Sequence, residues 1–89
     1  MPEISRFFGI IIRMYTEPNA PHHESHFHAY YQEFSAVFGW NAMDLIGGDM
    51  PRKQERLILK WAKMYKDELK ENWKLLQSGE LPNKIEPLR

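Results

Sequence analysis

The segment 51–77 constrains the fold of this chain most, because its apolar side chains gather on one side of a helix. On a helical wheel, that side carries Leu57, Ile58, Trp61, Ala62, Met64, Tyr65, Leu69, Trp73, Leu75 and Leu76. Pro51 is a favoured first helical residue, and Gly79 is suited to a left-handed cap at the end. A helix this amphipathic must cover another apolar surface, which the residues before it have to supply as a sheet.

The first fifty residues show the alternation that is typical of strands. A first strand is expected over 4–16, with one face formed by Phe8, Ile10, Ile12 and Met14. Two prolines within 17–21 end this strand. Alternation resumes over 26–31, and a turn at Gln32-Glu33 leads to a third strand over 34–40.

Met43 to Ile46 predicts a short fourth strand, which Gly47-Gly48-Asp49 closes, and residues 84–86 are a candidate edge strand. At 89 residues the chain has room for one domain. We therefore predict an α+β fold in a single domain over 1–89, in which an antiparallel sheet of about four strands packs against one long C-terminal amphipathic helix.

The composition excludes several classes of protein. There is no cysteine, so disulfides, thiolate catalysis and cysteine-bearing zinc motifs are ruled out. The N-terminal residues do not resemble a secretory signal. The longest apolar run, 7–12, is far shorter than the roughly 20 residues that span a bilayer. We expect a cytoplasmic protein that does not contact a membrane.

All the histidines of the chain lie in one short stretch: His22, His23, His26 and His28. His26 and His28 are two residues apart on a predicted strand, so both rings point to the same face. That spacing suits two ligands of one zinc or other divalent metal, with His22 or His23 as a third ligand. An open fourth position would allow hydrolysis by metal-bound water, which suggests a metal-dependent hydrolase or nuclease.

A second interpretation of the histidines needs no cofactor. They could form a hydrogen-bonded polar face that stacks on Tyr15 and Tyr30. Either Glu17 or Glu24 could add an oxygen ligand in the first interpretation. The sequence leaves both interpretations open.

Basic residues line the outward side of the predicted helix. Segment 51–77 has eight Lys or Arg and four Asp or Glu, a net charge of +4, and the rest of the chain carries −4. We call the following residues the basic stripe: Arg56, Lys60, Lys63, Lys70 and Lys74. It is a candidate surface for an acidic protein or for nucleic acid, or an ordinary solvated face. The pI of about 6.9 disfavours a dedicated nucleic-acid binder.

Nearly the whole chain resembles the bacterial family called domain of unknown function 4160. The residues that carry the resemblance are Met1-Pro2-Glu3-Ile4-Ser5, Phe8-Gly9-Ile10 to Met14-Tyr15, His22-His23, His26-Phe27-His28, Tyr31, Gly48-Asp49-Met50-Pro51, Trp61, Glu68-Leu69, Trp73, Gly79 and Lys84-Ile85-Glu86-Pro87-Leu88. Two positions depart from the family pattern. Ser25 stands where proline is usual, and Tyr65 stands where a histidine is common on the helix.

The resemblance implies a small bacterial protein that is often encoded beside a second small protein, in pairs proposed to be toxin–antitoxin-like. It therefore implies a protein partner encoded nearby and assigns no chemistry. An exposed sheet edge could also pair with a second copy of the chain. Our preferred hypothesis is an interaction component of a two-gene module, and the metal-dependent hydrolase is the alternative.

Overall fold

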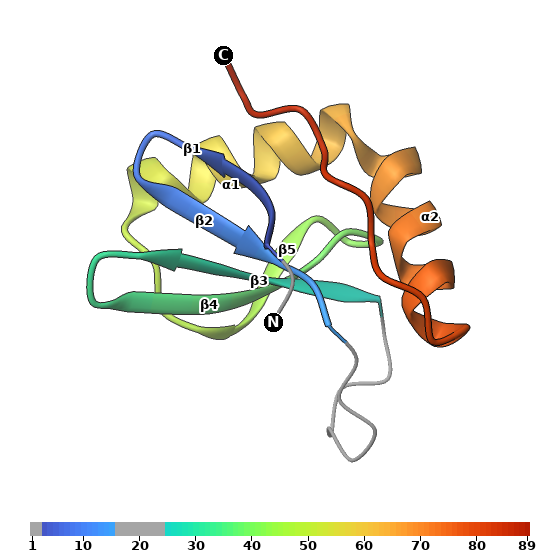
Figure 1. The fold of residues 1–89 in the computed structure, drawn as a ribbon. Coiled ribbons are helices and arrows are strands. Elements are labelled where there is room, and N and C mark those ends of the chain that lie inside the picture. Colours follow the sequence, from blue (N-terminus) through green and yellow to red (C-terminus); the bar gives the residue numbers. More distant parts are fainter. Residues whose placement is uncertain (1–2, 16–24) are drawn as a thin grey trace.

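Over residues 3–15 and 25–89, which the computed structural model describes, the chain forms a five-stranded antiparallel sheet and two helices. The elements are β1 (Glu3–Phe7), β2 (Ile10–Arg13), β3 (His26–Tyr31), β4 (Phe34–Gly39), β5 (Asp44–Gly48), α1 (Arg52–Met64) and α2 (Lys66–Gln77). Each strand lies beside its neighbours in sequence, in the order β1-β2-β3-β4-β5 (Figure 1). The α+β class is confirmed, but the predicted four strands and one helix are five strands and two helices.

The predicted first strand over 4–16 was wrong, because this segment is a hairpin. The chain reverses at Phe8-Gly9, where φ is +49° and +79°, and Phe7 pairs with Ile10. Positive φ at both central residues is the feature of two-residue turns that match the twist of the strands. The turn places Phe7 on the buried face with Ile10, whereas Phe8, which was expected on that face, is 59% exposed.

The β3–β4 connection agrees with the sequence prediction, whereas the end of β5 does not. The β3–β4 hairpin turns at Gln32-Glu33, as predicted. Strand β5 continues to Gly48, so the two glycines predicted as a turn belong to the strand. Gly48 has a φ of +78°, and a Cβ there would lie 2.3 Å from the backbone oxygen of Ser35. Only glycine fits this contact between β4 and β5.

The predicted long helix is divided at Tyr65. This residue has φ −116° and ψ 29°, outside helical values, and α2 runs at an angle to α1, beside the end of the sheet where β3 begins (Figure 1). Pro51 precedes the first helical residue rather than being it. Gly79 ends α2 with φ +80°, and its backbone N–H donates to the Leu76 carbonyl at 3.1 Å, which confirms the predicted cap.

Aromatic rings fill the space between the sheet and the helices. Phe27 on β3 stacks on Phe38 of β4, with ring centroids 5.6 Å apart. Trp61 of α1 meets Phe27 edge to face at 5.7 Å and lies 5.5 Å from Phe7 of β1. Met64, which was predicted to face the sheet, is instead 58% exposed, because α1 ends there and the chain changes direction.

Residues 80–89 form neither helix nor strand, yet they are firmly attached to the fold. The predicted edge strand over 84–86 is absent, and this segment makes one backbone hydrogen bond to β1, in which the Ile85 N–H donates to the Ile4 carbonyl at 2.7 Å. The Asn72 side chain, which is 1% exposed, donates to the Asn83 carbonyl at 2.9 Å and accepts from its N–H at 2.8 Å. The tail therefore connects β1 to α2.

Candidate functional site

His26 and His28 lie at the beginning of β3, with their ring centroids 5.4 Å apart. His26 is 2% exposed and packs against Trp73 of α2, with centroids 5.1 Å apart. His28 is half-buried and stacks on Tyr15 at 4.3 Å with an interplanar angle of 13°. The Tyr15 hydroxyl and His28 Nδ1 share a hydrogen bond of 3.2 Å, whose donor depends on the imidazole tautomer.

The second interpretation of the histidines is therefore confirmed for one contact, the stacking of His28 on Tyr15. Tyr30, the other predicted partner, instead lies under the Arg13 guanidinium, whose carbon is 5.2 Å from the ring centroid. This is within the range of a cation–π contact. These four side chains are half-buried, and they form two polar–aromatic pairs on the sheet.

The metal site stays a prediction. His22 and His23 lie outside the described residues, as do Glu17 and Glu24. Within 3–15 and 25–89, no three His, Cys, Asp or Glu side chains come close enough to hold a metal ion together. The described pair, His26 and His28, would need further ligands from residues 16–24.

The basic stripe is exposed throughout, but it is divided between two helices. Arg56, Lys60 and Lys63 lie on α1, and Lys70 and Lys74 lie on α2. Helix α1 has five Lys or Arg and one acidic residue, a net charge of +4. Helix α2 has three of each sign and is neutral. The positive charge is therefore concentrated on α1, which the single-helix prediction did not show.

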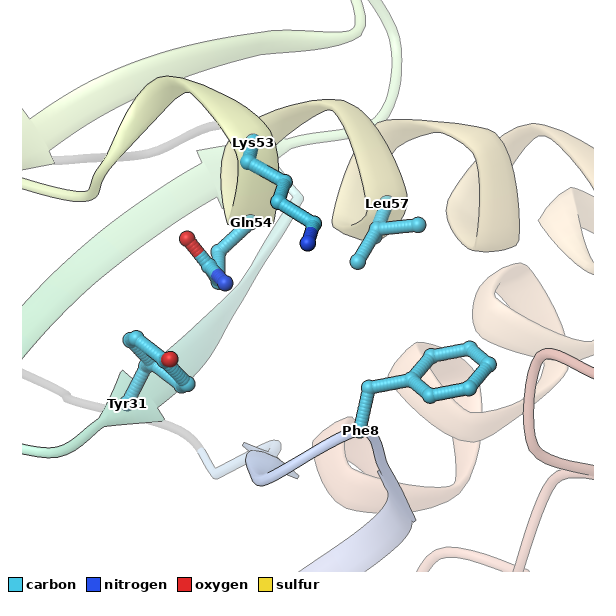
Figure 2. Close-up of a pocket in the computed structure, with 5 residues that line it drawn as sticks. All are labelled: Phe8, Tyr31, Lys53, Gln54 and Leu57. Carbon is cyan, nitrogen blue, oxygen red and sulfur yellow. The ribbon is translucent and has the colours of Figure 1, made fainter.

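The sequence did not predict a pocket between the β1–β2 turn, the end of β3 and the start of α1. The Phe8 pocket, as we call it, has a volume of about 390 Å³ and is lined by Phe8, Tyr31, Lys53, Gln54 and Leu57. Figure 2 shows Phe8 and Leu57 on opposite sides of the space, with the Lys53 amine and the Gln54 amide beside it. It lies at the opposite end of β3 from the histidines, because Tyr31 is the last residue of that strand.

One ion pair on β1 has shifted pKa values without forming part of a site. Arg6 donates two hydrogen bonds to the Glu3 carboxylate, at 2.7 and 3.3 Å. These bonds lower the pKa of Glu3 and raise the pKa of Arg6. Because the pair lies at the exposed edge of the sheet, it contributes little to stability.

In the part of the chain that the structure describes, no helix is long and apolar enough to cross a membrane. No curated protein and no solved structure matches the chain. Among protein families, the domain of unknown function DUF4160 matches residues 9–74. This span runs from the β1–β2 turn to near the end of α2, and it includes the histidine pair, the Phe8 pocket except Phe8 itself, and the basic stripe. By this match, the protein belongs to the DUF4160 family.

Proposed function

We propose that this protein works by binding a protein partner in the cytoplasm, as the interaction component of a two-gene, toxin–antitoxin-like module. One observation carries the proposal: the concentration of exposed positive charge on α1, a helix of 13 residues. At 1.5 Å per residue the helix is about 20 Å long, enough to meet a surface patch on another small protein. The neutral α2 makes the charge a local feature rather than a property of every helix.

An acidic protein fits this surface better than nucleic acid does. The whole chain has 12 basic and 12 acidic residues, so it lacks the long-range positive field that nucleic-acid binders use. Electrostatic complementarity chiefly raises association rates and selects the partner. A short basic helix on a neutral protein is suited to that role.

The test is to co-express the chain with the product of the adjacent gene and measure their affinity by calorimetry. We expect Lys60→Glu and Lys63→Glu together to weaken binding at least about tenfold, and to reduce its dependence on salt. The matched control, Lys70→Glu with Lys74→Glu on α2, should change the affinity less than about threefold.

Two results would contradict the proposal. If the wild-type proteins do not associate at micromolar concentration, there is no partner of this kind. If the α1 and α2 reversals weaken binding equally, the charge of α1 is not the feature that the partner recognises. Circular dichroism of each variant separates loss of binding from loss of fold.

The metal-dependent hydrolase is a second candidate, which the spacing of His26 and His28 favours. Zinc bound at about 2.1 Å to one nitrogen of each ring, with a tetrahedral angle between them, would put the centroids about 5 Å apart. The observed 5.4 Å is close to this value. Since Tyr15 is hydrogen-bonded to His28 Nδ1, His28 would bind the metal through Nε2.

This candidate predicts that one equivalent of zinc binds with measurable heat and raises the melting temperature. His28→Ala should weaken zinc binding at least about tenfold, because each imidazole is a large part of a small ligand set. Tyr15→Phe, which keeps the stacked ring, should have a much smaller effect. A titration of the wild type with neither heat nor thermal shift would remove the basis of the hydrolase.

A further inference from the structure

Phe8 departs from two local rules at the tip of the β1–β2 hairpin. It has a φ of +49°, which an aromatic L-residue adopts at a cost and which Asn adopts readily before glycine in such turns. Its ring is also 59% exposed, although most large apolar side chains in a small protein are needed for its core. A large apolar side chain that is both exposed and held at a strained φ points to a use outside the folding of its own turn.

The surroundings of Phe8 are those of a binding pocket. Leu57 supplies a second apolar wall, and the ring of Tyr31 closes the end beside Gly9, where a Cβ would come within 3.4 Å of it. Lys53 and Gln54 are the polar members (Figure 2). A volume of about 390 Å³ lies within the range of sites that bind small ligands or single large side chains.

Beside the pocket, one face of α1 carries further exposed apolar and basic side chains. Leu57, Lys60 and Met64 follow Lys53 at intervals of four, three and four residues, so that they share one face of the helix. Lys60 is exposed and Met64 is 58% exposed. This face therefore alternates apolar and positively charged side chains, and it extends from the Phe8 pocket across the charged helix.

We propose that the Phe8 pocket receives a large apolar side chain from an acidic segment of the partner, whose carboxylates lie against Lys53 and Lys60. This rests on the proposed function, since it names the site and the chemistry by which the partner binds. The apolar anchor would supply most of the affinity, as buried aromatic and aliphatic anchors do in other interfaces. The flanking carboxylates would match the net charge of +4 on α1.

Nucleic acid fits the pocket less well. Lys53 is the one charged side chain among its five lining residues, so the pocket itself offers a phosphate backbone a single cation. Leu57 opposite Phe8 offers an aliphatic wall, which suits a protein side chain better than a stacked base.

The direct test is an NMR titration of the full chain with a synthetic nonapeptide, in which one tryptophan stands between two runs of four aspartates. We expect shifts of the backbone amides of Phe8, Gly9, Tyr31 and the first two turns of α1. A peptide with serine in place of tryptophan, and one with lysines in place of the aspartates, should each bind at least tenfold more weakly. A 12-nucleotide polyuridylate should not perturb the same amides.

Phe8→Asn is the decisive variant, because stability and binding should change in opposite directions. Asn adopts a positive φ with less strain than Phe, so the melting temperature should rise by about 2–6 °C. The affinity for the peptide should fall at least tenfold, because the pocket loses the ring of Phe8. Leu81→Asn removes a side chain that is 79% exposed and lies outside the pocket, and it should leave binding unchanged.

The inference would be overturned if the peptide shifted amides away from the pocket, or if the serine peptide bound as tightly as the tryptophan peptide. It would also be overturned if polyuridylate shifted the same amides, or if the Phe8→Asn protein bound the peptide as tightly as the wild type. The failure of the proposed function is a separate observation. In that case the adjacent gene product would not bind the wild-type chain, whereas failure of this inference alone would leave that partner bound and insensitive to Phe8→Asn.

Discussion

Replacing Trp61 by alanine will lower the free energy of unfolding by about 3–5 kcal/mol. The indole is fully buried and contacts the rings of Phe7 and Phe27, so its removal opens a cavity where β1, β3 and α1 meet. Its Nε1 also donates to the Glu86 carbonyl at 2.8 Å. Because small domains are stable by only about 5–15 kcal/mol, urea denaturation should show a variant that is close to unfolded in water.

Trp61→Phe is the matched control. It keeps most of the ring packing and loses the hydrogen bond to the tail, so it should cost about 1–2 kcal/mol. If the alanine and phenylalanine variants were equally destabilised, the contribution of Trp61 would come from the tail rather than from the aromatic core.

Asn72→Asp should destabilise the protein by about 2–4 kcal/mol at pH 7, and this loss should disappear in acid. The Asn72 amide donates to one backbone group of Asn83 and accepts from another, whereas an ionised carboxylate can only accept. Burial and the facing carbonyl oxygen would raise the pKa of the introduced carboxyl above its ordinary value of about 3.9.

The direction in which the stability of Asn72→Asp changes with pH follows from proton binding. Below about pH 3 the introduced carboxyl is protonated in the folded and the unfolded chain, and its hydroxyl can donate to the Asn83 carbonyl. As the pH rises from there, the unfolded chain loses its proton first, so the folded state is progressively penalised until the raised pKa is passed. Urea denaturation across this range should show the gap to the wild type widening with pH.

Hydrogen exchange gives a second measurement for the same variant. The amide of Ile85, which is hydrogen-bonded to Ile4, should lose at least as much protection at pH 7 as the amides of β3, because the tail can detach without unfolding of the sheet. The exposed Asn41 offers the control, because Asn41→Asp adds the same charge without touching the tail. A constant difference in stability between Asn72→Asp and the wild type at every pH would show that the amide does not act through these two bonds.

The sequence was sufficient for the fold class because its two periods are distinct: alternation before Gly48 and helical spacing after Pro51. It could not reveal the β1–β2 turn, since Phe8-Gly9 interrupts the apolar run with another large apolar side chain instead of the usual Asn. The break at Tyr65 was equally hidden. No proline or glycine marks it. Tyr65 also keeps helical hydrogen bonds in both directions, because its N–H donates to the Trp61 carbonyl and its own carbonyl accepts from the Leu69 N–H.

The candidate sites were predictable to different degrees. Strand periodicity placed His26 and His28 on one face, and the stacking on Tyr15 followed from that face. The burial of His26 did not, because it depends on Trp73 from α2, whose direction is set by the break at Tyr65. The Phe8 pocket was missed for a related reason: with Phe8 assigned to the buried face of one long strand, no exposed aromatic residue was expected near Lys53.

The attachment of the tail has a consequence for how the chain matures. During synthesis, β1 leaves the ribosome before the other elements of this fold. Its Ile4 carbonyl accepts a hydrogen bond from the N–H of Ile85, which leaves the ribosome after both helices. Until then the outer edge of β1 has this carbonyl open to other strands, and Asn72 and the Trp61 indole lack their partners in the tail. We therefore expect nascent chains stalled within α2 to be the form most prone to aggregation.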